Sequence, residues 1–249
     1  LIKSILMNTA DYVLVDGPTF ASGYGLANAR RAAEVITESQ FQISEVENGN
    51  QVDISIPVPD QIDGKSISRL KVMLYWTDKE ASPYAGPALV NNLDLVVADA
   101  AGDHLPWVLD VTPARADQPA TRGVDALNNV EQVVIDSPGS GTVTARVTGS
   151  AVPFGPQTFY LVYSYVLDEL IVTHPMGGEQ FFSGQNKVVF WDSPYLGAAA
   201  NVDDVAYSLD GMNTWTSFHG NSTAVRSASI LPVPETPLTE AYDLVTRGA

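Results

Sequence analysis

The chain has 249 residues, of which 13 are Lys or Arg and 29 are Asp or Glu, so its formal net charge at pH 7 is −16. That acidity disfavours phosphate backbones and anionic lipid, so we expect no nucleic-acid partner and no membrane-surface partner. The sequence has no Cys and 3 His, which excludes disulfides, a thiol nucleophile and thiolate metal sites. It also lacks an apolar run of the roughly 18 residues that a membrane span needs. Hydrophobic residues make up 45%, enough for folded cores.

The first 42 residues favour two short helices. Near the start, apolar residues recur with a period close to 3.6, at Ile2, Ile5, Leu6 and Ala10. Asn28 can cap a second helix. The apolar positions of that helix would be Ala29, Ala32, Ala33 and Ile36. So many small residues indicate close packing against a larger body.

From Ile43 the period changes to two, which is typical of half-buried strands. Residues 52–58 alternate apolar and polar side chains. Five further apolar runs follow, separated by turn-forming clusters, at residues 70–76, 93–97, 130–135, 141–147 and 157–165. This pattern predicts an all-β sandwich or barrel of about eight strands.

A second, smaller β unit is predicted from about Leu170. Its expected strands lie at residues 187–191, 205–208, 215–218 and 241–246, with a hairpin turn at Asp210-Gly211. The acidity belongs to the two β segments. Residues 43–168 hold 7 Lys or Arg against 16 Asp or Glu, and residues 169–249 hold 3 against 9.

Motifs in all three segments resemble one family, the subtilisin-like serine peptidases. Residues 1–10 (LIKSILMNTA) and 22–33 (SGYGLANARRAA) resemble the last stretch of its catalytic domain. The middle segment is similar to the jelly-roll domain that follows the catalytic domain in one bacterial branch. Its motifs are VMLYWTD at 72–78, LVNNLDL at 89–95, NNVE at 128–131 and GPQTF at 155–159. The third segment resembles immunoglobulin-like modules, through PMGGE at 175–179 and YSLDGMNTW at 207–215.

The resemblance implies a mainly β chain of three parts. Residues 1–42 would be a helical remnant of an α/β catalytic domain, 43–168 a jelly-roll β-sandwich, and 169–249 an immunoglobulin-like β module. The parent would be a secreted, extracellular serine endopeptidase acting on peptide or protein substrates. In that reading the chain is non-catalytic, and it braces the catalytic domain and spaces or docks it.

The family's Asp, His and Ser motifs all lie upstream of the helix at residues 2–10, so no catalytic or cofactor-binding residue is assigned here. The expected partner is an upstream catalytic polypeptide of the same protein. An alternative from another class is a binding or structural β-sandwich module of an extracellular assembly, stabilised by calcium.

Asp78, Asn91, Asn92 and Asp94 are the candidate metal ligands. Calcium takes six to eight oxygen ligands from carboxylates, amides and backbone carbonyls. The resembling jelly rolls often bind calcium near such positions, usually with Asp where Asn92 stands. The competing interpretation is that the Asn side chains cap loop backbone groups while Asp94 faces solvent.

A second polar cluster comprises Asp125, Asn128, Asn129 and Glu131. Loop hydrogen bonding is the favoured interpretation, and a site shared with the first cluster is the alternative. The four Trp residues are assigned mainly to cores rather than to a sugar-binding platform, with Trp107 expected to be the most exposed.

Overall fold

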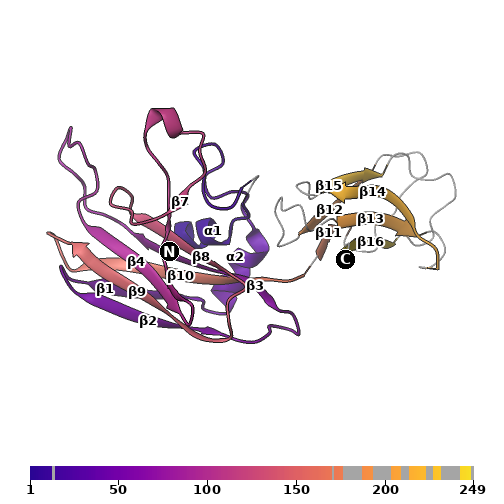
Figure 1. Ribbon diagram of the computed structural model, residues 1–249, viewed down its shortest axis with the longest axis horizontal. Helices are drawn as coiled ribbons and strands as arrows, with labels where there is room; N and C mark the ends of the chain where they lie inside the picture. Colours follow the sequence, from indigo (N-terminus) through magenta and orange to yellow (C-terminus); the bar gives the residue numbers. More distant parts are fainter. Residues whose placement is uncertain are drawn as a thin grey trace. The chain divides into compact units, whose positions relative to one another are not determined.

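The computed structural model describes residues 1–12, 15–169, 171–175, 187–192, 203–208, 213–222, 227–230 and 242–247. The chain is mainly β, and it divides into two compact units, Leu1–Leu167 and Asp168–Ala249 (Figure 1). The helical segment at the start of the chain therefore belongs to the same compact unit as the first set of strands.

The first unit is a sandwich of two four-stranded antiparallel sheets. One sheet has the order β1 (Phe41–Val46), β10 (Gln157–Leu167), β3 (Ile67–Trp76) and β8 (Val130–Asp136). The other has the order β2 (Gln51–Val58), β9 (Gly141–Ala151), β4 (Asn92–Asp99) and β5 (Gly102–His104). Each of the six apolar or alternating runs of the middle segment lies within one of these strands. β1 begins at Phe41, two residues before the expected boundary.

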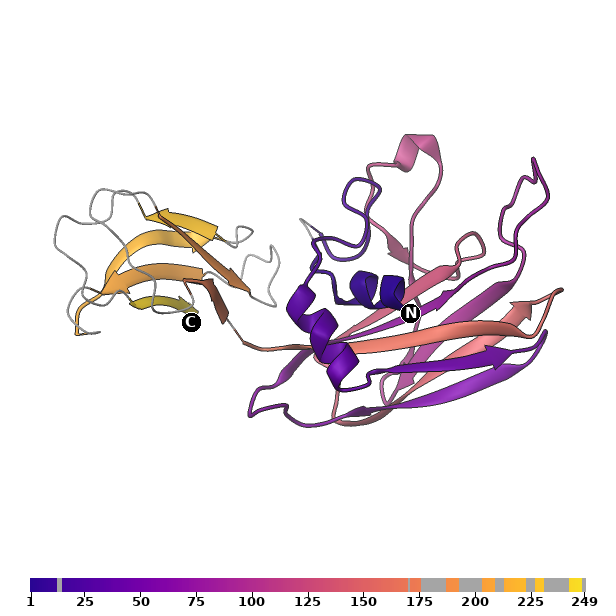
Figure 2. The same cartoon turned by 180° about the vertical axis from the view of Figure 1, so that it is seen from behind.

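The strand pairing is that of a jelly roll. Early strands pair with late ones: β1 with β10, β2 with β9, and β3 with β8, while β4 pairs with β5. The pairs β10–β3 and β9–β4 then complete the two sheets. This is a long hairpin of chain rolled into two layers (Figure 2).

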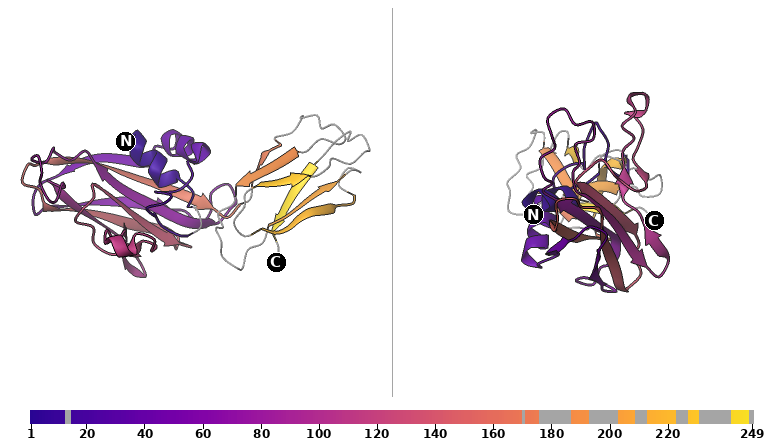
Figure 3. Two further views of the ribbon diagram at one scale, coloured as in Figure 1. Left: turned by 90° about the horizontal axis from the view of Figure 1, so that it is seen from above. Right: turned by 90° about the vertical axis from the view of Figure 1, so that its left-hand side faces the viewer.

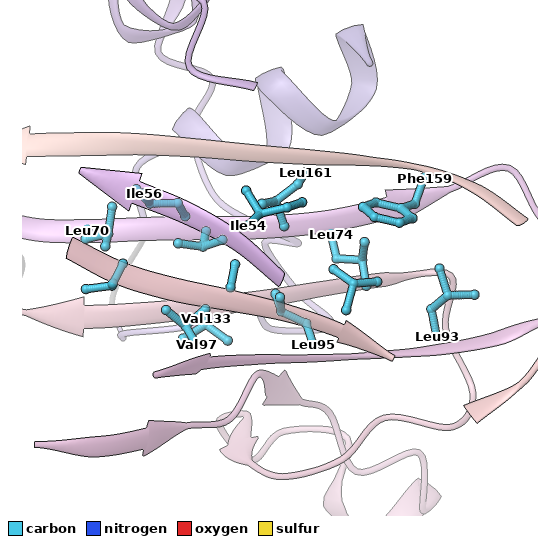
Figure 4. Close-up of a cluster of buried hydrophobic side chains, with 14 of the residues drawn as sticks. Ile54, Ile56, Leu70, Leu74, Leu93, Leu95, Val97, Val133, Phe159 and Leu161 are labelled. Carbon is cyan, nitrogen blue, oxygen red and sulfur yellow. The ribbon is translucent and has the colours of Figure 1, made fainter. Parts of the chain in front are cut away.

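The space between the sheets holds one apolar core. Ile54, Ile56 and Val58 of β2 alternate with exposed residues, as the sequence predicted. Side chains from both sheets point toward one another there (Figure 4). Among those that exclude water almost completely are Leu70, Leu74, Trp76, Leu93, Leu95, Phe159 and Leu161.

Two helices, α1 (Ile2–Thr9) and α2 (Ala29–Thr37), cover the outer face of the β1-β10-β3-β8 sheet (Figure 3). Ile5, Ala32 and Val35 pack there against Val162 of β10. The predicted cap is confirmed, because the Asn28 side chain accepts a hydrogen bond from the Arg31 backbone N–H. None of the helices in the described part of the chain is long and apolar enough to span a membrane.

The connection from β5 to β8 carries a short pair of strands, β6 (Trp107–Val108) and β7 (Thr121–Arg122), with the 3₁₀ turn η1 (Pro113–Arg115) between them. Trp107 is half-buried, with the Arg122 guanidinium 3.6 Å from its ring centroid. The expectation that Trp107 is the most exposed Trp is wrong, since Trp215 is 37% exposed. Trp76 and Trp191 are buried.

The second unit contains two three-stranded antiparallel sheets. One is β11 (Ile171–His174), β12 (Lys187–Asp192) and β15 (Ser227–Ile230), and the other is β14 (Thr216–Ser222), β13 (Asp203–Ser208) and β16 (Tyr242–Arg247). The predicted hairpin turn at residues 210–211 and most of the motif at 175–179 lie outside the described residues.

Candidate functional site

The loop between β3 and β4 is organised by the carboxylate of Asp78. Its Oδ2 accepts from the Val90 N–H at 2.7 Å, and its Oδ1 accepts from the N–H groups of Asn91 and Lys79, both at 2.9 Å. Three backbone donors therefore occupy the oxygens that were candidate calcium ligands. The carboxylate closes the loop from one strand to the next.

Asn91 also has a structural role. Its side chain is 1% exposed, and its Nδ2 donates to Gln157 Oε1 at 2.7 Å and to the Phe154 carbonyl at 3.1 Å. Its Oδ1 accepts from the Phe154 N–H at 3.2 Å. Its backbone carbonyl accepts from the Trp76 indole N–H at 2.9 Å. This is the loop hydrogen bonding that the competing interpretation described.

Asn92 and Asp94, two residues apart on β4, are placed differently. The Oδ1 atoms of both are buried and accept no hydrogen bond. Asp94 is only half-exposed, and its other oxygen accepts from the Ser150 hydroxyl. A buried acceptor without a donor is costly, so these two oxygens are the part of the predicted set that suits a cation.

Glu131 of the second cluster lies near both clusters, since the charges of Asp94 and Asp125 both act on its carboxyl group. It lies on β8 opposite Leu74, is 1% exposed, and its Oε2 accepts from the Leu95 N–H of β4 at 2.6 Å. Its carboxyl group thus ties the edges of the two sheets together. Its Oε1 is a third buried oxygen without a donor.

The pKa of Glu131 is raised to about 9, chiefly by burial and also by the nearby charges of Asp94 and Asp125, while the hydrogen bond from the Leu95 N–H acts to lower it. Without a cation, Glu131 is therefore neutral at pH 7. Within the described residues, no three Asp, Glu, His or Cys side chains form a metal-ligand group. A cation here would need amide and backbone oxygens as well.

The rest of the second cluster forms loop hydrogen bonds, as predicted. Asp125 Oδ1 accepts from the N–H groups of Leu127 and Asn128, and its Oδ2 accepts from Asn128 Nδ2. Asn129 Nδ2 donates to the Trp76 carbonyl at 2.7 Å. These contacts position the start of β8.

A buried polar network joins α1 to the sheet beneath it. Asn8 Nδ2 donates to the Lys71 carbonyl of β3 and to the Ser164 hydroxyl of β10, each at 3.2 Å. Asn8 Oδ1 accepts from Gln132 Nε2 at 3.0 Å, and Gln132 Oε1 accepts from the Tyr12 hydroxyl at 2.7 Å. Every one of these side chains is at most 3% exposed. The network fixes both the position and the rotation of α1.

Lys71 extends this network under the chain that leaves α1. Its Nζ donates to the Ala10 carbonyl at 2.6 Å and lies 4.3 Å from the centroid of the Tyr12 ring. Burial raises the pKa of Tyr12, so its hydroxyl stays a hydrogen-bond donor throughout the physiological range. These contacts attach residues 8–12 firmly to β3.

The outward surface of the helical segment includes four exposed apolar side chains. Ile2 and Leu6, one turn apart on α1, are 63% and 44% exposed, while Ser4, Asn8 and Thr9 face the sheet. Phe20 and Leu26 in the following loop are 52% and 65% exposed. The four exposed residues, Ile2, Leu6, Phe20 and Leu26, are called the outer apolar group below.

The Gly-x-Gly phrase before α2 has a steric reason. Asp11 and Leu26 form a two-way backbone bridge, with both hydrogen bonds at 2.8 Å. Gly25 has φ +106°, and a Cβ there would lie 1.9 Å from the Asp11 carbonyl oxygen. Only glycine permits this approach, which brings Asp11 to the buried Arg31 guanidinium.

No family model matches this chain. The chain is similar to the Serine protease/ABC transporter B family protein tagB of Dictyostelium discoideum, with 33% identity over 97 residues. The matched part is 38% of this chain and 5% of that protein. The chain thus spans a small fraction of the length of the curated relative that it matches.

Proposed function

We propose that this chain is a non-catalytic region of a secreted subtilisin-like serine endopeptidase, in which residues 1–42 complete the catalytic domain and the jelly roll braces it. The motifs at residues 1–10 and 22–33 support this, as does the similarity to a protein named as a serine protease. The upstream catalytic polypeptide is the partner, and peptides or proteins are the substrates of the whole.

The two-sided character of α1 carries the proposal. A surface helix ordinarily turns its apolar side chains inward and its polar ones to water. In α1, the buried side includes Ser4, Asn8 and Thr9, while Ile2 and Leu6 point outward. Such a helix is suited to lie between two bodies. The jelly roll is one of them, and the catalytic domain would be the other, covering the outer apolar group.

The test uses the natural polypeptide that contains this chain, isolated from its source by an antibody against residues 43–167. A fluorophosphonate probe should label a serine upstream of Leu1 in that polypeptide, or in a chain that copurifies with it. Intact-mass and peptide analysis would locate the label. A polypeptide without any labelled serine would contradict the proposal.

Substitutions in the outer apolar group test whether a catalytic domain covers it. Leu6→Glu in the natural polypeptide should reduce peptidase activity and yield, whereas in the 249-residue chain it should leave stability within about 0.5 kcal/mol. Ile43→Glu is the matched control, because Ile43 is 53% exposed on β1, outside the helical segment. Equal effects of the two substitutions would argue against a covering catalytic domain.

A calcium-stabilised structural module is the second candidate, favoured by the donor-free oxygens of Asn92, Asp94 and Glu131. Calcium would satisfy them together with backbone carbonyls, and binding to the native state would raise the unfolding temperature. A chelator should then lower that temperature, and added calcium should restore it. An unchanged midpoint would reject the calcium proposal without touching the peptidase proposal.

A further inference from the structure

A hollow of about 360 Å³ opens in the first unit beside the ends of β2 and β10. The rings of Tyr163 and Tyr165 line it, together with Pro57, Pro59, Gln40 and the carboxylate-bearing Glu38. Neither the calcium candidates nor the outer apolar group contributes a residue to it. None of its eight lining residues is a Lys, Arg or His.

The two tyrosine rings are held at a fixed angle. Their centroids are 5.9 Å apart and their planes make an angle of 70°. The Tyr165 hydroxyl donates to the Pro57 carbonyl, and the Tyr163 backbone N–H donates to the Gln40 carbonyl at 3.0 Å. Burial raises the pKa of both hydroxyls, so the rings stay neutral.

Two non-parallel aromatic rings and a carboxylate are the components of a site for an organic cation. A sugar, in contrast, stacks on one flat ring face. The cation is favoured further by the net charge of −16, which attracts basic ligands.

The strand pairing next to the hollow indicates which kind of ligand the cationic group belongs to. On the β1 side, the ladder of β10 ends at Val162 and one further hydrogen bond joins the Tyr163 N–H to the Gln40 carbonyl, whereas on the β3 side the pairing continues to Leu167. An extended peptide can add to such a strand through its main chain while placing a side chain in the adjacent hollow.

We propose that the hollow formed by Glu38, Tyr163 and Tyr165 binds the arginine or lysine side chain of an extended basic peptide, which lies along β10 beyond Tyr163. This site does not depend on the peptidase assignment. The Glu38 carboxylate pairs with the cation, and the tyrosine rings enclose its apolar stem.

The test is an NMR titration of the 249-residue chain with an acetylated, amidated Ala-Arg-Ala peptide and with its citrulline analogue, which has a similar shape and no charge. The arginine peptide should shift the Tyr163 and Tyr165 resonances, and the citrulline peptide should bind at least about fivefold more weakly. Equal binding of the two peptides, or shifts located elsewhere, would overturn the proposal. So would the absence of shifts up to the solubility limit of the peptide, or tighter binding of a disaccharide at the same residues.

Matched variants separate charge from shape. Glu38→Gln should weaken the arginine peptide about three- to tenfold, while Glu45→Gln, which removes an exposed charge from β1, should have no effect. Tyr163→Phe keeps the ring and should bind within about twofold of the natural chain, whereas Tyr163→Leu should lose about fivefold. An unchanged affinity in Glu38→Gln would refute the assignment. The Tyr163→Phe variant is the control that shows whether substitution at this position disturbs folding.

Discussion

The inner face of the β1-β10-β3-β8 sheet is apolar, whereas its outer face combines apolar packing with a buried polar network, and β3 takes part in both faces. Leu70, Val72 and Leu74 point into the sandwich, where apolar contacts surround them. Lys71 points the other way and is equally buried, but in a polar setting beneath α1. Apolar packing tolerates small shifts of neighbouring elements, whereas hydrogen bonds between buried groups do not. We therefore expect the inner face to supply most of the stability and the outer face to determine where the helical segment lies.

The largest expected effect is on the inner face. Leu74→Ala removes a side chain that is 0% exposed, so it should reduce the free energy of unfolding by about 3 kcal/mol through lost burial and a cavity. Urea unfolding measures this. Ile43→Ala, at an exposed position of β1, should change the free energy by less than about 0.5 kcal/mol. Similar losses in both variants would show that the core is not the dominant contribution.

Asn8→Ala tests the outer face and should cost about 2 kcal/mol, because Gln132 Nε2 and the Lys71 carbonyl lose their partner in a buried site. Hydrogen exchange should accelerate first in α1, while the sandwich amides stay protected. Asn8→Asp should not rescue stability, since a carboxylate cannot donate to the Lys71 carbonyl or the Ser164 hydroxyl. A fully stable Asn8→Asp protein would mean that the two faces do not differ as described.

The sequence predicted the inner face better than the outer one, for a physical reason. Alternation at residues 51–58 is a property of one strand, so it predicted β2 and its buried side directly. The helical period at residues 2–10 predicted α1, but not that Asn8 would face inward, because that depends on Gln132 and Ser164 in distant strands. Asn8 is not one of the apolar positions of that period, so the local pattern carried no signal for its burial.

Glu131 shows the same limitation within the core. Its two-residue spacing from Val133 and Ile135 placed it on the inward side of β8, which was the available signal. Its partner, the Leu95 N–H, belongs to the edge of the opposite sheet. Edge-to-edge contacts of this kind follow from the jelly-roll closure, which no short motif encodes.

Glu131→Gln should raise stability at pH 8 by on the order of 2 kcal/mol in metal-free protein. The folded-state pKa of about 9 lies above the usual value of 4.5. The folded protein therefore keeps a proton that the unfolded chain releases, and the stability from this group, complete below pH 4.5, is lost as the pH rises toward 9. The natural chain should accordingly unfold more easily at pH 8 than at pH 5, and the Gln variant should lack this trend.

Calcium would add a second pH dependence. It binds the ionised carboxylate, so it competes with the proton on Glu131 and should bind better at high pH. Thermal unfolding with and without calcium, at pH 5 and pH 8, should show the larger stabilisation at pH 8. Glu45→Gln serves as the control, since Glu45 is exposed. A Glu131→Gln protein with the natural pH dependence would exclude this carboxyl group as its source.

The smallest effect is expected at the cap of α2, on the outer face. Asn28 Oδ1 accepts from the Arg31 N–H at 3.0 Å, and its Nδ2 donates to Asp11 Oδ2 at 2.9 Å. Asn28→Ala removes both contacts and should cost about 1 kcal/mol, measured by urea unfolding with hydrogen exchange of the α2 amides.

Asn28→Ser keeps a capping oxygen and should cost less. Asn28→Asp also keeps the cap but places a second carboxylate beside Asp11, so it should be no more stable than the Ala variant. If Asn28→Asp is as stable as the natural chain, the Arg31 guanidinium alone neutralises both carboxylates, and the hydrogen bond to Asp11 contributes little to holding α2 on the sheet.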